Sequence, residues 1–367
     1  MDKSILFLTG QFGVGGVERV TVTLANAMVK RGDKVCVAAF DIPENSLIDE
    51  LDDDVEVLRF ATGWLTKANC AMLREVLMRR GVTHIINQWC LPVGVTVFCR
   101  KAARGMGVKL LAVHHTMPSR NARVMGAKNP LVRLAWRIIS GLSLHLVYRF
   151  SDAYILLSPS YVTIFKKFAW IPSGKKIFVI SNPVVIDKIT DIEREKAMLY
   201  VGRLTETEKR VDRVIDIWKH LADRLPDWRL DIVGDGPDRA RLEECARGLA
   251  RITFHGFQKP NRFYAQSKML LLTSDFEGFA LVLVECMAMG CVPVVYASYP
   301  AAKDIVRGGG KLLTPPFSAL EFADAIVELA RNEDKLNEMS ARALTIVDDF
   351  GLAPIMKKWD SALNALA

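Results

Sequence analysis

The chain has 367 residues, half of them apolar and a quarter charged, with a formal net charge of +8. This length favours two domains over one compact core, and the composition is typical of a folded soluble protein. No uninterrupted apolar run reaches the ~18 residues of a membrane span, MDKSILFLTG lacks the layout of a signal peptide, and the six histidines show no metal-binding spacing. Seven cysteines without a Cys-x-x-Cys pair indicate reduced, mostly buried thiols in a cytoplasmic protein.

The first half of the chain alternates short β-branched runs with longer stretches of helical periodicity. This pattern predicts an open parallel sheet with helices on both faces. Helices are expected at Val17–Arg31 and Ala68–Arg80. Strands are expected at Ile5–Thr9, Lys34–Phe40, Val55–Leu58, Thr83–Asn87, Leu110–Val113, Ala153–Leu157 and Ile177–Ile180.

A glycine-rich segment, TGQFGVGGVERV, follows the first expected strand and opens the first expected helix. Gly15 and Gly16 would let the backbone pass close to a ligand, and a helix N-terminus favours an anion. A dinucleotide-binding fingerprint needs a glycine where Glu18 stands, although Asp41 lies where a ribose-binding acid would be expected. An NAD site is therefore disfavoured, while a tight structural turn remains an alternative to an anion site.

Basic residues are concentrated in the first half of the chain. Residues 1–185 carry a charge balance of +11 and the remainder −3, and twelve basic residues occur between Val76 and Ser151 without an acidic one. Such a region either aids solubility or meets an anionic partner, and we favour the partner.

The run Asp52–Asp54 resembles a metal-binding Asp-x-Asp motif, but it precedes a strand, which favours a solvated turn.

Two adjacent histidines, His114 and His115, stand at the carboxyl end of the fifth expected strand. Ligands of open α/β sheets bind beyond the carboxyl ends of the strands. A single histidine is often a core residue. A pair at this position, ahead of a long basic segment, makes a role at a ligand site as plausible as a place in the core.

A polar connector, Ser181–Ala197, leads to a second alternation of the same kind. The tail FGLAPIMKKWDSALNALA has one apolar face and predicts a final amphipathic helix. We therefore expect two α/β domains of similar size, facing each other across a cleft. The strands of the second are expected at Met198–Val201, Leu230–Val233, Ile252–Phe254, Met269–Thr273 and Val292–Tyr296, with two further helices between Ser318 and Val347.

Two cations, Arg203 and Lys209, follow the first strand of the second domain. Together at a strand's carboxyl end they would suit a diphosphate, although a surface arginine and an ordinary lysine at a helix start would look the same.

The segment DFEGFALVLVECMAMG predicts a buried helix, with Ser274 or Asp275 as cap and Gly290 as stop. Its N-terminus carries a partial charge of roughly +0.5 and would seat a phosphate. Glu285, in the expected third turn, needs a partner, because a carboxylate removed from water without one costs several kcal/mol.

In combination, these motifs resemble those of the retaining GT4-type glycosyltransferases, whose GT-B architecture consists of two Rossmann-like domains. The resemblance rests on Glu277 and Glu285 as an E-x7-E motif, on Gly202-Arg203 with Lys209, and on the segments GDGP, HGF, GGVERV and ISNPV. They occur in the family's order over nearly the whole chain. Two departures, Ala280 in place of a second glycine and SYPAAKDIV without the usual Gly-Gly, leave the sugar and some phosphate contacts open.

The resemblance implies an acceptor-binding domain over residues 1–185, a donor-binding domain over 186–349, and a C-terminal helix, about 350–367, packed on the first. Arg203 and Lys209 would grip the donor diphosphate, Glu277 the donor sugar, and His115 the transferred sugar, with His114 as the fallback. Glu285 would bind the ribose hydroxyls, a salt bridge to an arginine being the alternative. Further donor-binding positions are Gly15, Gly16, Gly256, Phe257, Gly278, Phe279, Ala280 and Leu281, and acceptor-binding positions are His114 and Arg120.

The implied reaction is retaining transfer from a nucleotide sugar, with UDP favoured, to a glycan or lipid-linked acceptor in surface polysaccharide synthesis. It needs no cofactor or essential metal, because the leaving phosphate oxygen would take the acceptor's proton. The basic region 76–151 mixes Arg and Lys with large apolar residues, which suggests an anionic membrane surface as partner and a peripheral cytoplasmic location; no nucleic acid is expected. A soluble acceptor remains an alternative to the membrane-bound one. Two alternatives to the transferase activity remain: a sugar-nucleotide epimerase on the same fold, or a non-catalytic nucleotide-sugar-binding subunit.

Overall fold

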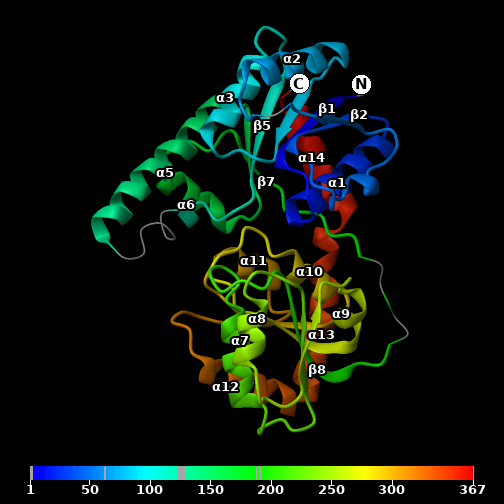
Figure 1. Ribbon diagram of the computed structural model, residues 1–367, viewed down its shortest axis with the longest axis vertical. Helices are drawn as coiled ribbons and strands as arrows, with labels where there is room; N and C mark the ends of the chain where they lie inside the picture. Colours follow the sequence, from blue (N-terminus) through cyan, green and yellow to red (C-terminus); the bar gives the residue numbers. More distant parts are fainter. Residues whose placement is uncertain (1–2, 62, 122–128, 187–188, 190–191, 367) are drawn as a thin grey trace. The chain divides into compact units, whose positions relative to one another are not determined.

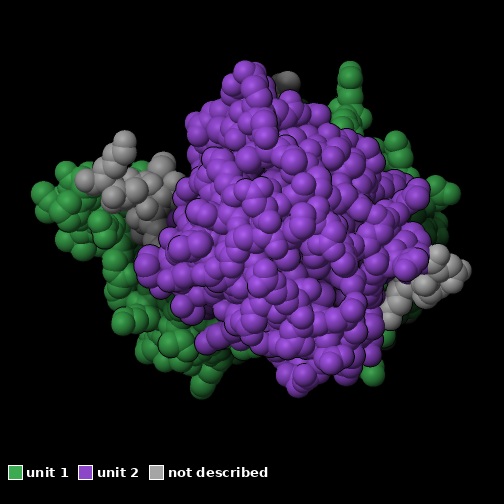
Figure 2. Space-filling model, turned by 90° about the horizontal axis from the view of Figure 1, so that it is seen from below, with its two compact units in different colours: residues 1–183, 352–367 green, residues 184–351 purple. Residues whose placement is uncertain are grey.

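The computed structural model describes residues 3–61, 63–121, 129–186, 189 and 192–366. The chain forms two compact units, unit 1 from residues 1–183 with 352–367, and unit 2 from residues 184–351. Figure 2 colours them green and purple. The predicted domain boundary after residue 185 falls beside this division, while the acceptor and donor roles of the two domains stay predictions.

Unit 1 contains a parallel sheet with strand order β3-β2-β1-β4-β5-β6-β7 and helices on both faces (Figure 1). Each strand predicted for this half is present, within a residue or two at the ends. The strands are β1 (Ser4–Gln11), β2 (Lys34–Asp41), β3 (Glu56–Arg59), β4 (His84–Asn87), β5 (Lys109–His114), β6 (Ala153–Leu156) and β7 (Ile177–Val179). The helices are α1 (Gly16–Lys30), η1 (Ile48–Glu50), α2 (Lys67–Arg79), α3 (Val93–Ala102), α5 (Pro130–Phe150) and α6 (Ser160–Phe168).

Strand β1 shows why these segments form a central sheet. Its residues Ile5, Leu6, Phe7 and Leu8 are all fully buried. A parallel strand covered on both faces is apolar along its length and does not alternate. β1 pairs with β2 on one side and β4 on the other, so the order of the strands reverses here, at the place where ligands of such sheets bind.

Unit 2 repeats this design with strand order β10-β9-β8-β11-β12-β13. All five predicted strands are present; the short β13 was not predicted. The strands are β8 (Glu195–Val201), β9 (Arg229–Val233), β10 (Ile252–Gly256), β11 (Ser267–Leu272), β12 (Val292–Tyr296) and β13 (Lys311–Leu313). The helices are α7 (Val211–Leu221), α8 (Arg239–Cys245), α9 (Asn261–Gln266), α10 (Leu281–Ala288), α11 (Ala301–Val306), α12 (Ala319–Arg331), α13 (Glu333–Ile346) and η2 (Val347–Phe350).

The last helix, α14 (Leu352–Asn364), belongs to unit 1 although it follows unit 2 in the chain. Its apolar face is formed by Ile355, Trp359, Ala362 and Leu363, all buried. Figure 1 shows α14, in red, beside α1. The predicted amphipathic helix is thus present, and its buried face completes the core of unit 1.

The prediction that Ser274 or Asp275 caps the buried helix is wrong. α10 begins only at Leu281, with Ala280 in the N-cap position, and the Asp275 carboxylate is instead paired with arginine side chains. Glu285 therefore lies in the second turn of α10 rather than the third. The predicted stop is present, because Gly290, with φ of +68°, follows the end of the helix.

Candidate active site

The loops after β8 and β11 bring together two charged side chains of unit 2. Lys209 lies between β8 and α7, and Glu277 lies between β11 and α10. Lys209 Nζ donates a hydrogen bond to Glu277 Oε1 at 2.7 Å, and the two side chains are 31% and 11% exposed. β8 pairs with both β9 and β11, so this ion pair stands at the switch point of the sheet, where a ligand is expected.

Glu285 has a partner that the sequence did not predict. Tyr264, in α9, is fully buried, and its hydroxyl donates a hydrogen bond to Glu285 Oε2 at 2.8 Å. Burial, and next the Glu285 carboxylate, raise the pKa of Tyr264 well above its usual value. The phenol therefore stays protonated and remains a donor to Glu285, which is only partly buried.

The N-terminus of α10 lies directly after Glu277. Gly278 is partly buried, and Phe279 is buried with its ring 5.5 Å from that of Phe350. Ala280 provides no side-chain hydrogen bond as the N-cap residue, and Leu281 is the first helical residue. The first backbone N–H groups of α10 thus have no capping side chain, an arrangement that favours an anion.

Three other predicted residues lie at strand ends of unit 2. Arg203 follows β8 and is exposed. Gly256 ends β10 with φ of +73°, and its carbonyl accepts a hydrogen bond from the Gly234 N–H at 2.8 Å. Phe257 is 72% exposed, which leaves its aromatic ring accessible to a flat ligand.

The glycine-rich turn of unit 1 already holds a carboxylate. Gly15 is the N-cap residue of α1 and Gly16 its first residue. A Cβ on Gly15 would meet Glu18 Oε2 at 2.5 Å, so the Glu18 carboxylate lies over the turn. Burial raises the pKa of Glu18, while the backbone N–H groups of Glu18 and Gly13 lower it. In this structure the predicted anion position is thus filled by the chain itself.

The two histidines after β5 have different surroundings. His114 is buried, and its Nδ1 lies 3.0 Å from the Tyr154 hydroxyl and 3.7 Å from Cys90 Sγ. His115 Nε2 lies 2.5 Å from Gln88 Oε1, a contact that requires the proton on Nε2. Burial lowers the pKa of His114 to about 4, and burial together with His114 lowers the pKa of His115 to about 3, so both rings are neutral at pH 7.

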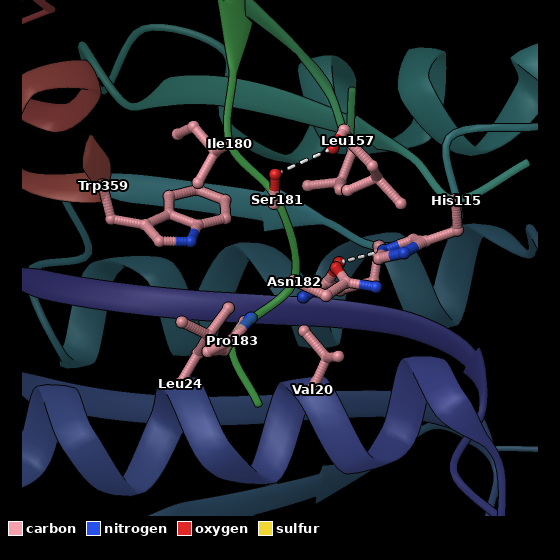
Figure 3. A pocket seen from close by; sticks show the side chains of 11 residues that line it. Val20, Leu24, His115, Leu157, Ile180, Ser181, Asn182, Pro183 and Trp359 are labelled. Carbon is pink, nitrogen blue, oxygen red and sulfur yellow. Dashed lines mark hydrogen bonds between the residues drawn. The ribbon is translucent and has the colours of Figure 1, made fainter. Parts of the chain in front are cut away.

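His115 lines a small pocket of unit 1, whereas His114 does not. The pocket lies between the β5 end, α1, α14 and the segment Ile180–Pro183. Figure 3 shows His115 reaching into it on the side of Asn182, with Val20 and Leu24 of α1 and Trp359 of α14 on its other walls. The pocket is too small to hold a ligand in this structure. His115 is partly exposed whereas His114 is buried, so His115 is the more accessible of the two.

Arg120, the other predicted acceptor-binding residue, is partly buried and lies in a helical segment after β5. Its backbone N–H donates to the Met117 carbonyl at 2.9 Å, and its Nη1 donates to Asn121 Oδ1 at 3.3 Å. Residues 122–128 of the predicted basic segment lie outside the described residues. Among the described residues there is no cluster of three or more His, Cys, Asp or Glu side chains that could hold a metal ion.

Sequence reasoning singled out both Lys209 and Glu277, which the structure brings into contact, while the roles given to them stay predictions. It missed Tyr264, Gln88 and Asn182, which stand beside predicted residues. The ISNPV segment was a signal for Asn182. Nothing in the local sequence marked Tyr264 or Gln88, because each meets its partner only through the fold.

Both units match known glycosyltransferase families. Residues 14–188 match the family described as Glycosyltransferase Family 4, and residues 195–332 match Glycosyl transferases group 1. An uncharacterized glycosyltransferase of Haemophilus influenzae is 24% identical over 377 residues, covering 99% of this chain and 100% of that protein.

Two further relatives have more specific names. An α-1,4-N-acetyl-D-galactosaminyltransferase of Campylobacter jejuni, whose named acceptor is a glycan on undecaprenyl diphosphate, is 25% identical over 370 residues, with 97% of this chain and 96% of that protein covered. The structure of HepE from Anabaena in complex with UDP-glucose is similar with a TM-score of 0.78 at 20% identity, covering 99% of each chain. The chain therefore belongs to the GT4-type glycosyltransferases, and its units are the two Rossmann-like halves of the GT-B fold.

Proposed function

We propose that this glycosyltransferase moves a hexose or N-acetylhexosamine from its UDP-linked donor to a glycan or lipid-linked acceptor, with retention of configuration, in surface polysaccharide or glycoconjugate synthesis. The observation that carries the proposal is the Lys209–Glu277 pair, 2.7 Å apart at the switch point of unit 2. An ammonium beside a carboxylate suits a ligand that carries a diphosphate next to sugar hydroxyls. The relatives that bind UDP-glucose or transfer N-acetylgalactosamine support this class of donor.

Each charged residue of the site then has a task in the transfer. Lys209, with Arg203, stabilises the negative charge that grows on the diphosphate as the sugar–phosphate bond breaks, and the uncapped N-terminus of α10 adds to this field. Glu277 accepts hydrogen bonds from donor sugar hydroxyls. Glu285, oriented by the Tyr264 hydroxyl, accepts hydrogen bonds from the ribose, and Phe257 lies beside the base.

Retention follows if the leaving phosphate oxygen takes the acceptor's proton on the face from which it departs. His115 is neutral at pH 7 because its pKa is lowered, and it acts as a hydrogen-bonding group toward the transferred sugar. Catalysis is then positioning and electrostatic stabilisation, with no resident metal. Full turnover in EDTA, and a product with the donor's anomeric configuration by NMR, are the expected results. Loss of turnover in EDTA, or an inverted product, would contradict this part.

A donor panel tests the proposed function directly. The purified protein is incubated with UDP- and GDP-sugars, and release of the free nucleotide is followed with and without the Glu277→Ala substitution. We expect one donor to be hydrolysed well above the others and this activity to be lost in Glu277→Ala. A wild-type protein that binds one of these donors but cleaves none would favour the non-catalytic alternative, and one that binds none would contradict the proposed function.

We also propose that unit 1 rests on the cytoplasmic face of an anionic membrane through α5. This helix contains Arg but no acidic residue, and among the described residues it is the one helix long and apolar enough, by length and composition, to cross a membrane. Its opposite face, with Ser140, Gly141, Leu144 and Val147, is buried in unit 1, so α5 would lie in the interface and not span it. The large exposed apolar side chains of α5 are Leu131, Val132, Leu134, Ile138, Ile139, Leu142 and Phe150.

A further inference from the structure

The loops that carry Lys209 and Glu277 are joined by more than this ion pair. The Asp275 N–H donates to the Glu208 carbonyl at 2.9 Å, and the Thr273 hydroxyl donates to the Arg210 carbonyl at 2.9 Å. The backbone on both sides of Lys209 is therefore bonded to the segment that leads to Glu277. Since β8 and β11 end at the same edge of the sheet, these bonds set how closely the two loops approach.

The Asp275 carboxylate lies at the centre of this junction. It accepts a hydrogen bond from Arg213 Nη1 at 2.6 Å and another from Arg210 Nη1 at 3.2 Å. Both arginines come from the Lys209 side of the junction, and Asp275 comes from the Glu277 side. One carboxylate thus ties the start of α7 to the loop that precedes α10.

Arg213 depends on Asp275 because it has little access to water. Its side chain is 11% exposed, and its guanidinium lies over the rings of Tyr296 and Phe317, 4.9 Å and 4.6 Å from their centroids. Arg213 Nη1 also donates to the Thr273 carbonyl at 3.0 Å. A buried cation of this kind destabilises the protein when its counter-ion is removed, so the position of Asp275 is strongly constrained.

Arg210, in the turn before α7, has a backbone conformation that is unfavourable for a residue with a side chain. Its φ of 52° and ψ of 50° place it in the left-handed region, which a non-glycine residue seldom adopts. It is the N-cap residue of α7, directly after Lys209. Two carboxylates form ion pairs with its guanidinium, Asp212 at 2.7 Å and Asp275 at 3.2 Å. Only Asp275 belongs to the loop between β11 and α10.

We propose that Asp275 is a positioning residue: by binding Arg213 and Arg210 it holds Lys209 beside Glu277, so that the diphosphate and sugar contacts are in place before a donor arrives. This inference rests on the proposed function for its kinetic consequence. It concerns neither of the glutamates of the E-x7-E motif. It assigns a task to a residue whose only sequence-level interpretation, as a helix cap, was wrong.

The substitution Asp275→Asn tests the proposal, with Asp212→Asn as a matched control. Both remove one carboxylate charge from Arg210, but in the described part of the chain the Asp212 carboxylate bonds to Arg210 and not to the β11–α10 loop. For Asp275→Asn we expect kcat for sugar transfer to fall by about 10- to 100-fold, the range for a misplaced catalytic group. Asp212→Asn should change it less than about threefold, on the scale of a surface ion pair.

Nucleotide binding separates positioning from general damage. Asp275→Asn should weaken binding of UDP, which reaches Lys209 through its diphosphate, but leave binding of uridine unchanged, because uridine meets the Glu285 side of the site. Loss of both in equal measure would show a structural role only. The double variant Asp275→Asn with Arg213→Met removes the buried unpaired charge; it should recover the unfolding midpoint while transfer stays low.

Hydrogen–deuterium exchange of the wild-type and variant chains gives a result that does not need a substrate. Peptides covering residues 205–213 and 273–281 should exchange faster in Asp275→Asn and not in Asp212→Asn. Unchanged exchange, or transfer equal to wild type in Asp275→Asn while Lys209→Ala is inactive, would overturn the inference and leave the proposed function standing. A wild type that binds no nucleotide would instead overturn the proposed function, and exchange alone would then decide whether Asp275 holds the loop.

Discussion

Glu285 is a carboxylate in a helix whose other side chains are mostly apolar and buried. The Tyr264 hydroxyl at 2.8 Å meets part of its need for hydrogen bonds, and its partial exposure leaves room for a ligand to add more. A carboxylate kept in such a place lowers stability relative to an apolar residue. A ligand that donates hydrogen bonds to the Glu285 carboxylate would offset this loss of stability.

Replacing Tyr264 with Phe should weaken nucleotide binding and stability together. The change removes one hydrogen bond to a charged group, worth about 1.5–3 kcal/mol, and leaves the shape of the core intact. UDP titration calorimetry and urea unfolding measure the two effects. Tyr148→Phe, which removes a bond to the Ser173 carbonyl in unit 1, is the control and should leave UDP binding unchanged. Unaltered UDP binding in Tyr264→Phe would show that Glu285 does not need this donor.

Two histidines of unit 1, His114 and His115, should make its stability depend on pH. The folded pKa of His114 is about 4, below its usual 6.5, and that of His115 is also lowered. Below pH 6.5 the unfolded chain binds protons that the folded chain does not, so stability is complete above that pH and falls as pH decreases toward 4. The slope is about 1.4 kcal/mol per pH unit for each such histidine.

Urea unfolding at pH 7, 6 and 5 measures this slope. His114→Gln should make this slope shallower. Equal slopes in the wild type and His114→Gln would mean that His114 is not responsible.

Lys209 and Glu277 could be singled out from the sequence, Lys209 as a cation at a helix start and Glu277 through the E-x7-E motif, and the structure brings them into contact. Their roles toward a donor stay predictions. Tyr264 could not be predicted, because a tyrosine in an apolar run resembles any core residue and its bond to Glu285 spans 21 positions. Asp275 was misjudged because its capping tendency is local, whereas its partners come from another loop.

At the scale of elements, the segment GDGP after β9 shows how closely strand ends approach one another. Gly234 has φ of +140°, and a Cβ there would meet the Gly202 carbonyl oxygen at 1.9 Å. Gly202 directly precedes Arg203. A side chain at position 234 would therefore push the β8 loop away from its place.

Gly234→Ala should destabilise unit 2 by about 1–3 kcal/mol because the added Cβ overpacks the contact with the Gly202 carbonyl. This loss comes in addition to the conformational cost of a positive φ, and sugar transfer should also fall. Gly248→Ala is the control: it also has positive φ, but its Cβ would meet nothing within 4 Å, so it carries the conformational cost of about 1–2 kcal/mol alone. Thermal unfolding measures the difference. An equal loss of stability in Gly234→Ala and Gly248→Ala would show that the loop after β8 moves aside without strain.

Helix α5 should lose membrane binding when its exposed face becomes polar. Burying one large aliphatic side chain contributes about 1.5–3 kcal/mol, so Leu134→Ser, Ile138→Ser and Leu142→Ser together should reduce flotation with phosphatidylglycerol vesicles at least about tenfold. The control variant changes Leu320 and Leu344, exposed leucines of unit 2, to Ser and should float like the wild type. A wild type that fails to float at low salt would refute membrane binding.

The strands were predictable because each central one is an apolar run buried on both faces, as in β1. The short β13 escaped because three half-buried residues give no pattern. The start of α10 was placed too early, since helix propensity cannot show that the segment before Leu281 is held by contacts to another loop. The basic region that contains α5 was expected to meet an anionic membrane surface, but only the fold shows which side of α5 is free.

At the scale of the whole molecule, α14 ties the end of the chain to its first unit. Trp359 is 3% exposed and lines the same pocket as His115. Trp359→Ala should lower the stability of unit 1 by about 3–5 kcal/mol, as large core truncations do, and leave unit 2 unchanged. Urea unfolding followed by hydrogen exchange in each unit measures this, with the exposed Trp64→Ala as the control. A loss shared equally by both units would mean that they unfold as one.

Because α14 follows unit 2, the ribosome finishes the second unit before it delivers the last piece of the first. At roughly 5–20 residues per second, the N-terminal sheet waits for some ten seconds or more with one apolar flank uncovered. Val20 and Leu24 of α1, which face Trp359 across the pocket, would be open to water or to a chaperone during this interval. The two units are thus completed in the reverse of their order along the chain.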